Sequence, residues 1–124
     1  MKREQRLRSA ADFRHVRDLA ERGWPHPLLV LYVAPNDLGH TRVGITVSGR
    51  VGKAVVRNKV RRRIREAIRA RLPRLQTGLD LVVVGRPASA RATWADLCQS
   101  LDVVFGRARA WQSAADQKQA APAT

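Results

Sequence analysis

Residues 52–72 read GKAVVRNKVRRRIREAIRARL, and this stretch has a strong helical pattern. Between Arg50 and Arg71, ten residues are basic and one, Glu66, is acidic. Because each residue of an α-helix turns by roughly 100°, the apolar and polar residues separate onto opposite faces. The apolar stripe holds Val56, Val60, Ile64, Ala67 and Ile68; the polar face holds Asn58, Arg62, Arg65 and Arg69, bordered by Arg57 and Arg61. The pattern predicts a helix that packs by one face and presents a rigid cationic surface with the other.

The charge on this helix is almost entirely of one sign. A solvated helix face usually mixes signs, whereas Arg stacked on Arg at i,i+4 costs a few tenths of a kcal/mol per pair. The whole chain carries 24 Lys and Arg against 10 Asp and Glu, for a formal charge of +14 and a pI near 11.7. The excess of Arg favours forked contacts to phosphate. We therefore expect a polyanionic partner.

Several other classes of protein fit the composition poorly. The chain has no run of about 18 apolar residues, and the charged start, Met1 to Arg8, leads into no apolar signal core, so we expect a cytoplasmic protein that does not span a membrane. Cys98 is the single cysteine, and we expect it in the core. His15, His26 and His40 are too scattered for a metal site, and we expect no cofactor bound by the protein alone.

The segments around the basic helix alternate between helix and strand patterns. Ser9 suits the N-cap of a helix and Gly23 suits its C-terminal end, and together they predict a helix over residues 10–22. Apolar runs predict strands at 28–33, 41–48 and 79–84, and Thr93 caps a last helix with apolar residues at helical spacing. The pattern does not settle whether residues 24–33 form one strand or two.

This order, helix, two or three strands, helix, strand, helix, predicts a two-layer α/β sandwich, αβββαβα if three strands precede the basic helix. We expect one domain over residues 1–111 and a flexible tail over 112–124, which has nothing large to bury. By default, a parallel crossover through the basic helix would be right-handed.

The residues favour binding over catalysis. The carboxylates are dispersed, and no nucleophile–base order or phosphate-cradling glycine loop occurs, so we expect no catalytic site on the protein. A basic helix embedded between strands suits the phosphates of folded RNA better than the base edges of DNA, and we expect no DNA partner. Phe13 and Tyr32 could stack on unpaired bases, and the small residues Gly44 and Thr46 would leave room on the sheet for an extended ligand.

The segment 50–66, RVGKAVVRNKVRRRIRE, closely resembles the signature of the bacterial ribonuclease P protein subunit, whose hallmark is an Arg-Asn-Arg-rich helix. The resemblance runs from about Leu7 to Phe105. It includes the Asp12-Phe13 pair, LVLY at 29–32 and RVGITVS at 42–48. The third hallmark position is Lys59, and Arg17 stands where the family often has a second aromatic residue.

The resemblance implies a subunit of the ribonucleoprotein that removes the 5′ leader from precursor tRNA, with the RNA as catalyst using bound magnesium. It also implies an α/β fold with a left-handed crossover, similar to a ribosomal-protein domain. The residues that would bind the catalytic RNA are Arg50, Lys53, Arg57, Asn58, Lys59, Arg61, Arg62 and Arg65. Those that would line a cleft for the precursor tRNA leader are Phe13, Arg17, Tyr32, Thr46 and Ser48. Two alternatives remain: a structural ribosomal-type RNA-binding protein or RNA chaperone, and a protein-only nuclease.

Overall fold

The computed structural model describes residues 1–112. Over these residues three α-helices and four strands follow one another in the order α1, β1, β2, β3, α2, β4, α3, which confirms the αβββαβα order. Short 3-10 turns precede α1 (Arg3–Gln5) and α2 (Gly49–Val51), and another follows β4 (Pro87–Arg91). The helices and strands are α1 (Ala10–Leu19), β1 (Gly23–Pro25), β2 (Leu29–Pro35), β3 (Arg42–Val47), α2 (Ala54–Arg71), β4 (Leu79–Gly85) and α3 (Trp94–Arg107).

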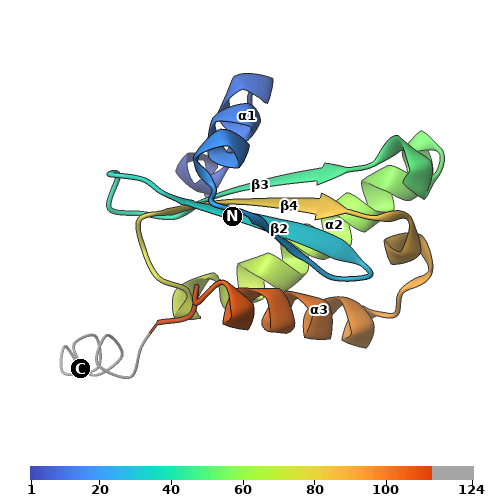
Figure 1. The fold of residues 1–124 in the computed structure, drawn as a ribbon. Coiled ribbons are helices and arrows are strands. Elements are labelled where there is room, and N and C mark those ends of the chain that lie inside the picture. Colours follow the sequence, from blue (N-terminus) through green and yellow to red (C-terminus); the bar gives the residue numbers. More distant parts are fainter. Residues whose placement is uncertain (113–124) are drawn as a thin grey trace.

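Within residues 1–112 the strands form one sheet in the order β1-β2-β4-β3. β3 and β4 are parallel, with Arg42 opposite Asp80, and the other neighbours are antiparallel. Helices α2 and α3 cover one face and complete the predicted two layers, while α1 lies on the opposite face, which it covers only in part (Figure 1). β3 is an edge strand, and the chain leaves it through the 3-10 turn Gly49–Val51 into α2.

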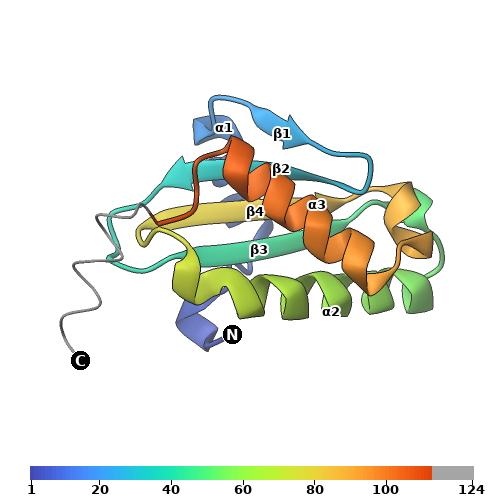
Figure 2. The same ribbon diagram turned by 90° about the horizontal axis from the view of Figure 1, so that it is seen from below.

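The connection from β3 through α2 to β4 is left-handed. Figure 2 views the sheet from the side of α2 and α3, with both parallel strands pointing right and β4 above β3. Turned so that the strands point up, β4 lies to the left of β3 behind the helix, which is the left-handed arrangement. The default for such units is right-handed, so the expectation from the family resemblance is confirmed against the general rule.

The main core lies between the sheet and the two helices. Val60, Ile64, Ala67 and Ile68 of the predicted stripe are buried there, against residues such as Leu31, Leu81 and Phe105. Val56 is an exception, because it lies in the first turn of α2 and is 36% exposed. Trp94, in the apolar pattern of the last helix, is also largely exposed, and Cys98 is half-buried at the margin of the core.

The first helix is shorter than predicted. Ser9 caps it as expected, since its side chain accepts a hydrogen bond from the Asp12 amide at 3.0 Å. The chain becomes extended at Ala20, before the predicted end at Arg22, because Gly23 to Pro25 must pair with β2 as a separate strand. The segment 24–33 therefore forms parts of two strands. At the other end, the amide of Gln112, the first residue of the predicted tail, donates to Arg74 O at 2.9 Å, and the rest of that tail lies outside the described residues.

Candidate nucleic-acid interface

The outer face of α2 carries most of the residues predicted to bind RNA. Asn58, Lys59 and Arg62 are exposed on this face, while Arg57, Arg61 and Arg65 are half-buried along it. Arg61 is oriented by its neighbour, because its guanidinium donates to Asn58 Oδ1 at 2.7 Å. Arg50 and Lys53 are exposed just before the helix. We call these eight residues, which lie on α2 and in the turn that leads into it, the α2 surface.

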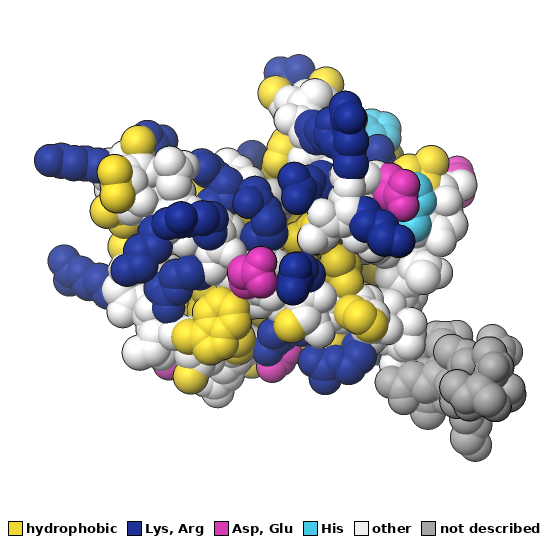
Figure 3. All heavy atoms as spheres, turned by 180° about the vertical axis from the view of Figure 1, so that it is seen from behind, with side chains coloured by type: hydrophobic (Ala, Val, Ile, Leu, Met, Phe, Trp, Pro, Cys, Tyr) yellow, Lys and Arg dark blue, Asp and Glu magenta, His cyan; other side chains and the backbone are white. Residues whose placement is uncertain are grey.

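The electrostatics of the α2 surface are those of an anion-binding site. The first turn of α2 has no acidic residue and no side-chain cap, so its partly positive N-terminal end is uncompensated. Over residues 1–112 none of the seven basic residues among these eight forms an ion pair. The Nε of Arg57 is buried and has no hydrogen-bond partner among the described residues. Figure 3, which views the molecule from behind Figure 1, shows Lys and Arg side chains spread over this face with few acidic ones among them.

Arg71 is the member of the basic run that the structure assigns to packing instead. It is 9% exposed, its Nε donates to Asp102 Oδ1 of α3 at 2.6 Å, and it also donates to Ala67 O. The hydrogen bond and charge of Asp102 raise the pKa of Arg71, against the opposing effect of burial. Arg71 therefore joins α2 to α3 and is unavailable to a ligand.

A second candidate site lies on the opposite face of the sheet, between α1 and β3. It is an open cleft of about 440 Å³. Its lining residues are Ala10, Phe13, Arg14, Arg17, Ile45, Thr46 and Val82. Three of the five residues predicted for the leader, Phe13, Arg17 and Thr46, therefore meet in one cleft, which we call the α1 cleft.

The other two predicted residues lie beside the α1 cleft. Tyr32 is half-buried on β2, and the guanidinium of Arg17 stacks over its ring at 5.1 Å from the centroid. Arg17 thus connects Tyr32 to the cleft. Ser48 lies past the end of β3, where its Oγ accepts a hydrogen bond from the Arg50 amide at 3.2 Å, and it is not part of the lining.

The expectation that Gly44 leaves room for a ligand is wrong. Gly44 lies directly under Phe13, and a Cβ atom there would be 2.5 Å from Phe13 Cε1. The missing side chain therefore accommodates the aromatic ring. Thr46, two residues further along the same face of β3, does line the open cleft.

Arg14 is a cleft residue that the sequence reasoning missed. It exposes its side chain one residue after Phe13 and adds a second cation to the lining beside Arg17. The signal is present in the sequence, because positions 10, 13, 14 and 17 follow the i, i+3, i+4, i+7 spacing of one helix face. The predicted cleft residues on this helix are only the aromatic Phe13 and, one turn later, Arg17.

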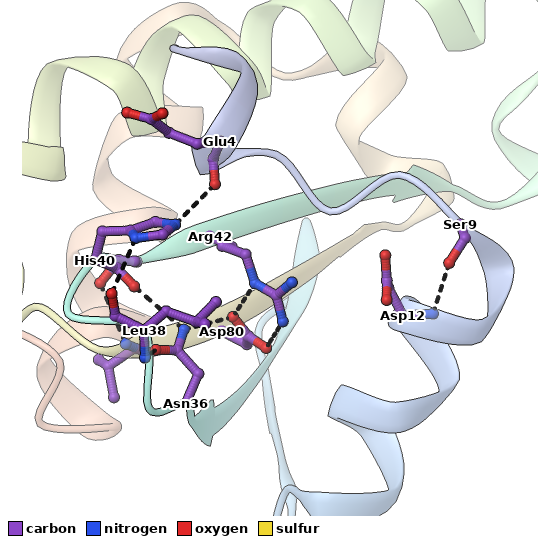
Figure 4. Close-up of polar contacts among 10 residues, drawn as sticks. Glu4, Ser9, Asp12, Asn36, Leu38, His40, Arg42 and Asp80 are labelled. Carbon is purple, nitrogen blue, oxygen red and sulfur yellow. Dashed lines mark hydrogen bonds and ion pairs between the residues drawn. The ribbon is translucent and has the colours of Figure 1, made fainter.

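A polar network holds the sheet beside this cleft (Figure 4). Asp80 of β4 is buried, with Arg42 donating to its two oxygens at 2.9 and 2.6 Å and Asn36 donating at 2.7 Å. Burial by itself would raise the pKa of Asp80, but the hydrogen bonds from Arg42 and Asn36 and the Arg42 charge outweigh it and lower the pKa below its usual value. The Asp80 carboxylate therefore serves the fold and is not free to bind a ligand. Over residues 1–112 no three His, Cys, Asp or Glu side chains gather as a metal site would require, and no helix is long and apolar enough to cross a membrane.

A cationic helix and a cationic cleft on opposite faces of one small α/β sheet define a basic nucleic-acid-binding protein. The family model described as Ribonuclease P matches residues 1–109. The ribonuclease P protein component of Herpetosiphon aurantiacus is 40% identical over 111 residues, covering 90% of this chain and 89% of the relative. The solved RNase P protein of Staphylococcus aureus matches with a TM-score of 0.79 and 28% identity, covering 87% of this chain and 98% of that one.

The RNase P protein of Thermotoga maritima gives a TM-score of 0.73 at 27% identity, covering 82% of this chain and 96% of that one. The chain belongs to the ribonuclease P protein family. It is an accessory subunit of an endoribonuclease, in the ribonucleoprotein that processes the 5′ leader of tRNA, and its partner is the RNase P RNA. The fold class and the family resemblance expected from the sequence are both confirmed.

Proposed function

We propose that the α2 surface docks on the RNase P RNA while the α1 cleft holds the 5′ leader of precursor tRNA, and that catalysis rests with the RNA. The observation that carries this proposal is the α2 surface itself, whose seven basic residues form no ion pair among residues 1–112. Cations that lie close together on one surface repel each other unless a polyanion neutralises them. Because the two sites lie on opposite faces of the sheet, two RNA segments could be bound together.

Docking through α2 would be driven by electrostatics. Each Lys or Arg that reaches a phosphate releases condensed counterions, so affinity falls steeply as salt rises. Guanidinium groups suit this role because their fork matches two phosphate oxygens at once. The helix is fixed by its buried face, so these groups are already arranged before RNA binds. This predicts recognition of phosphate positions and RNA shape more than of sequence.

The α1 cleft has the chemistry expected for an unpaired strand. Arg14 and Arg17 supply charge for the phosphates, and Phe13, Ile45 and Val82 supply an apolar surface for bases. Tyr32, held under Arg17, extends this surface. Thr46 adds a hydroxyl group to the cleft. Ser48, beyond the lining, lies in the direction in which a bound RNA strand would continue toward Arg50.

We assign magnesium to the RNA-containing holoenzyme and no cofactor to the protein alone. The donor set supports this assignment, because the buried carboxylate Asp80 is already bonded to Arg42 and Asn36. The cations of the protein would offset repulsion where leader and catalytic RNA meet, so that less magnesium is needed. A subunit with these partners would work in the cytoplasm.

Cleavage of precursor tRNA by RNase P RNA at low magnesium, with and without the protein, tests the proposal. We expect the protein to stimulate cleavage strongly at low magnesium and less as magnesium rises. No stimulation would refute it. The alternative of a ribosomal-type RNA-binding protein or RNA chaperone predicts equal affinity for ribosomal RNA, so competition between the two RNAs separates the two functions.

A further inference from the structure

The N-terminal segment (Met1–Arg8) is held along the free edge of β3. The Leu7 amide donates to Val43 O at 2.9 Å, and Arg6 forms an isolated parallel bridge with Val43. Leu7 is buried in the small core beneath α1, while Met1 packs against the main core on the other side of the sheet. The segment therefore crosses the edge of the sheet from one layer to the other.

His40 provides a further anchor. Its Nε2 lies 3.0 Å from Glu4 O, and its Nδ1 lies 3.2 Å from Leu38 O (Figure 4). Gln5 lines a small cavity together with His40 and with Leu72 and Pro73, which follow the end of α2. The N-terminal segment is thus fixed next to the C-terminal end of the basic helix, and Figure 2 shows the N-terminus beside that end.

The charges of this segment resemble those of the α2 surface. Lys2, Arg3, Arg6 and Arg8 are exposed, with Glu4 as the single acid. Over residues 1–112 none of the four forms an ion pair. By contrast, Arg42 and Arg71, which serve the fold, are each bonded to a carboxylate. The cations of the N-terminal segment extend the cationic surface from beside the last turn of α2, around the sheet edge, to the start of α1.

We infer that the N-terminal segment is a further part of the RNA interface and contacts the phosphodiester backbone of the RNase P RNA beside the C-terminal end of α2. This inference rests on the proposed function, because it extends the same docking surface. The anchors at Val43 and His40 hold the backbone of the segment before RNA arrives, so binding requires little further ordering of the chain. The interactions are electrostatic and independent of RNA sequence.

The full chain carrying Lys2→Gln, Arg3→Gln and Arg8→Gln provides the test. Arg6 stays, because its guanidinium donates to Met1 O at 3.2 Å and supports the segment. A charge-matched control carries Arg22→Gln, Arg107→Gln and Arg109→Gln, which lie around β1 and the end of α3. Affinity for the RNase P RNA is measured over a series of salt concentrations. We expect the log-log salt slope to fall by about one for each phosphate that the test variant no longer neutralises, and to be unchanged in the control.

Three results would overturn the inference: an unchanged slope in the test variant, an equal fall in the control, or an effect seen only as poorer discrimination between precursor and mature tRNA, which would assign the segment to the leader. The variant Arg3→Lys with Arg8→Lys keeps the charge and should keep the slope. Arg62→Ala with Arg65→Ala is measured alongside. If this pair also leaves the slope unchanged, the proposed function fails, whereas a fall in this pair alone rejects only the N-terminal contact.

Discussion

Gly44 shows how one missing side chain shapes the α1 cleft. A Cβ at this position would meet Phe13 Cε1 at 2.5 Å and Cζ at 2.8 Å, closer than any ordinary contact. We therefore expect Gly44→Ala to destabilise the protein by about 1–3 kcal/mol, because the ring must shift or the strand must move. Chemical denaturation followed by circular dichroism measures the loss of stability.

Gly49→Ala is the matched control, since no atom beyond Gly49 and its two neighbours in the chain lies within 4 Å of the added methyl group. This variant should stay within about 0.5 kcal/mol of the parent. Adding Phe13→Ala to Gly44→Ala should give a total loss of stability smaller than the sum of the two single losses, because the steric conflict disappears with the ring. Strict additivity would show that Gly44 does not act through Phe13.

Asp80 gives the protein a specific sensitivity to acid. Its pKa is lowered in the folded state from an ordinary value of 3.8, so its contribution to stability is complete above that value and disappears as the pH falls through the folded pKa. Asp80→Asn should cost about 1–3 kcal/mol at neutral pH, because Arg42 loses its charged partner. The difference from the parent should shrink below about pH 4. Urea denaturation at several pH values measures it, and a difference independent of pH would contradict the assignment.

Single residues were predicted well where one helix face decided their position. The spacing of Val60, Ile64 and Arg62 was enough to sort them into core and surface. It was not enough for Arg71, whose partner Asp102 lies 31 residues away on another helix. Gly44 was misjudged for the same reason, because the ring above it comes from a distant helix.

The basic helix combines two roles along its length, and neighbouring arginines separate them. Arg71 is buried and bonded to Asp102, whereas Arg69 is exposed and has only a 3.8 Å contact with the exposed Glu66. Arg71→Gln should lower stability by about 1–2 kcal/mol, a modest effect because the Asp102 side chain is half exposed, and should leave the RNA salt slope intact.

Arg69→Gln should change stability by less than about 0.5 kcal/mol, because exposed pairs contribute little. Asp102→Asn should reproduce part of the Arg71→Gln effect, since it removes the charge from the same interaction. Thermal unfolding and RNA titration of the three variants provide the measurements. A reduced salt slope for Arg71→Gln in a fully folded variant would place that residue at the RNA after all.

Elements were predicted to within a few residues where local pattern dominated. The basic helix was expected over 52–72 and forms over 54–71, and the Thr93 capping box begins α3 as expected. The end of α1 and the division of residues 24–33 depended on pairing between strands, which local pattern does not contain. The N-terminal segment was missed because its binding to β3 is a single bridge between distant residues.

At the scale of the molecule, a substitution in the α2 surface should leave binding at the α1 cleft intact, and the reverse should also hold. Arg62→Ala with Arg65→Ala should weaken binding of the RNase P RNA and lower its salt slope by about one unit for each phosphate left without a cation.

Tyr32→Ala, in the other site, should weaken the binding of precursor tRNA more than that of mature tRNA in the holoenzyme, by about 1–3 kcal/mol if the ring stacks on a base. Combining the changes should give additive effects, because the sites are far apart. Equal weakening for both tRNAs would return Tyr32 to a packing role beneath Arg17.

The left-handed crossover decides which faces of the sheet these sites occupy. With the same strand order, a right-handed connection would have carried α2 across to the face of α1, where it would compete for the area beside the cleft. As built, the sheet stands between the α2 surface and the α1 cleft, so under the proposed function the two RNA segments would bind on opposite sides of it. A helix with its side chains is roughly 10 Å across, so the α2 layer alone is about as thick as the distance over which physiological salt screens charge. Under the proposed function, the chirality of one loop-helix-loop connection would thus weaken the repulsion between the two RNA segments held at these sites.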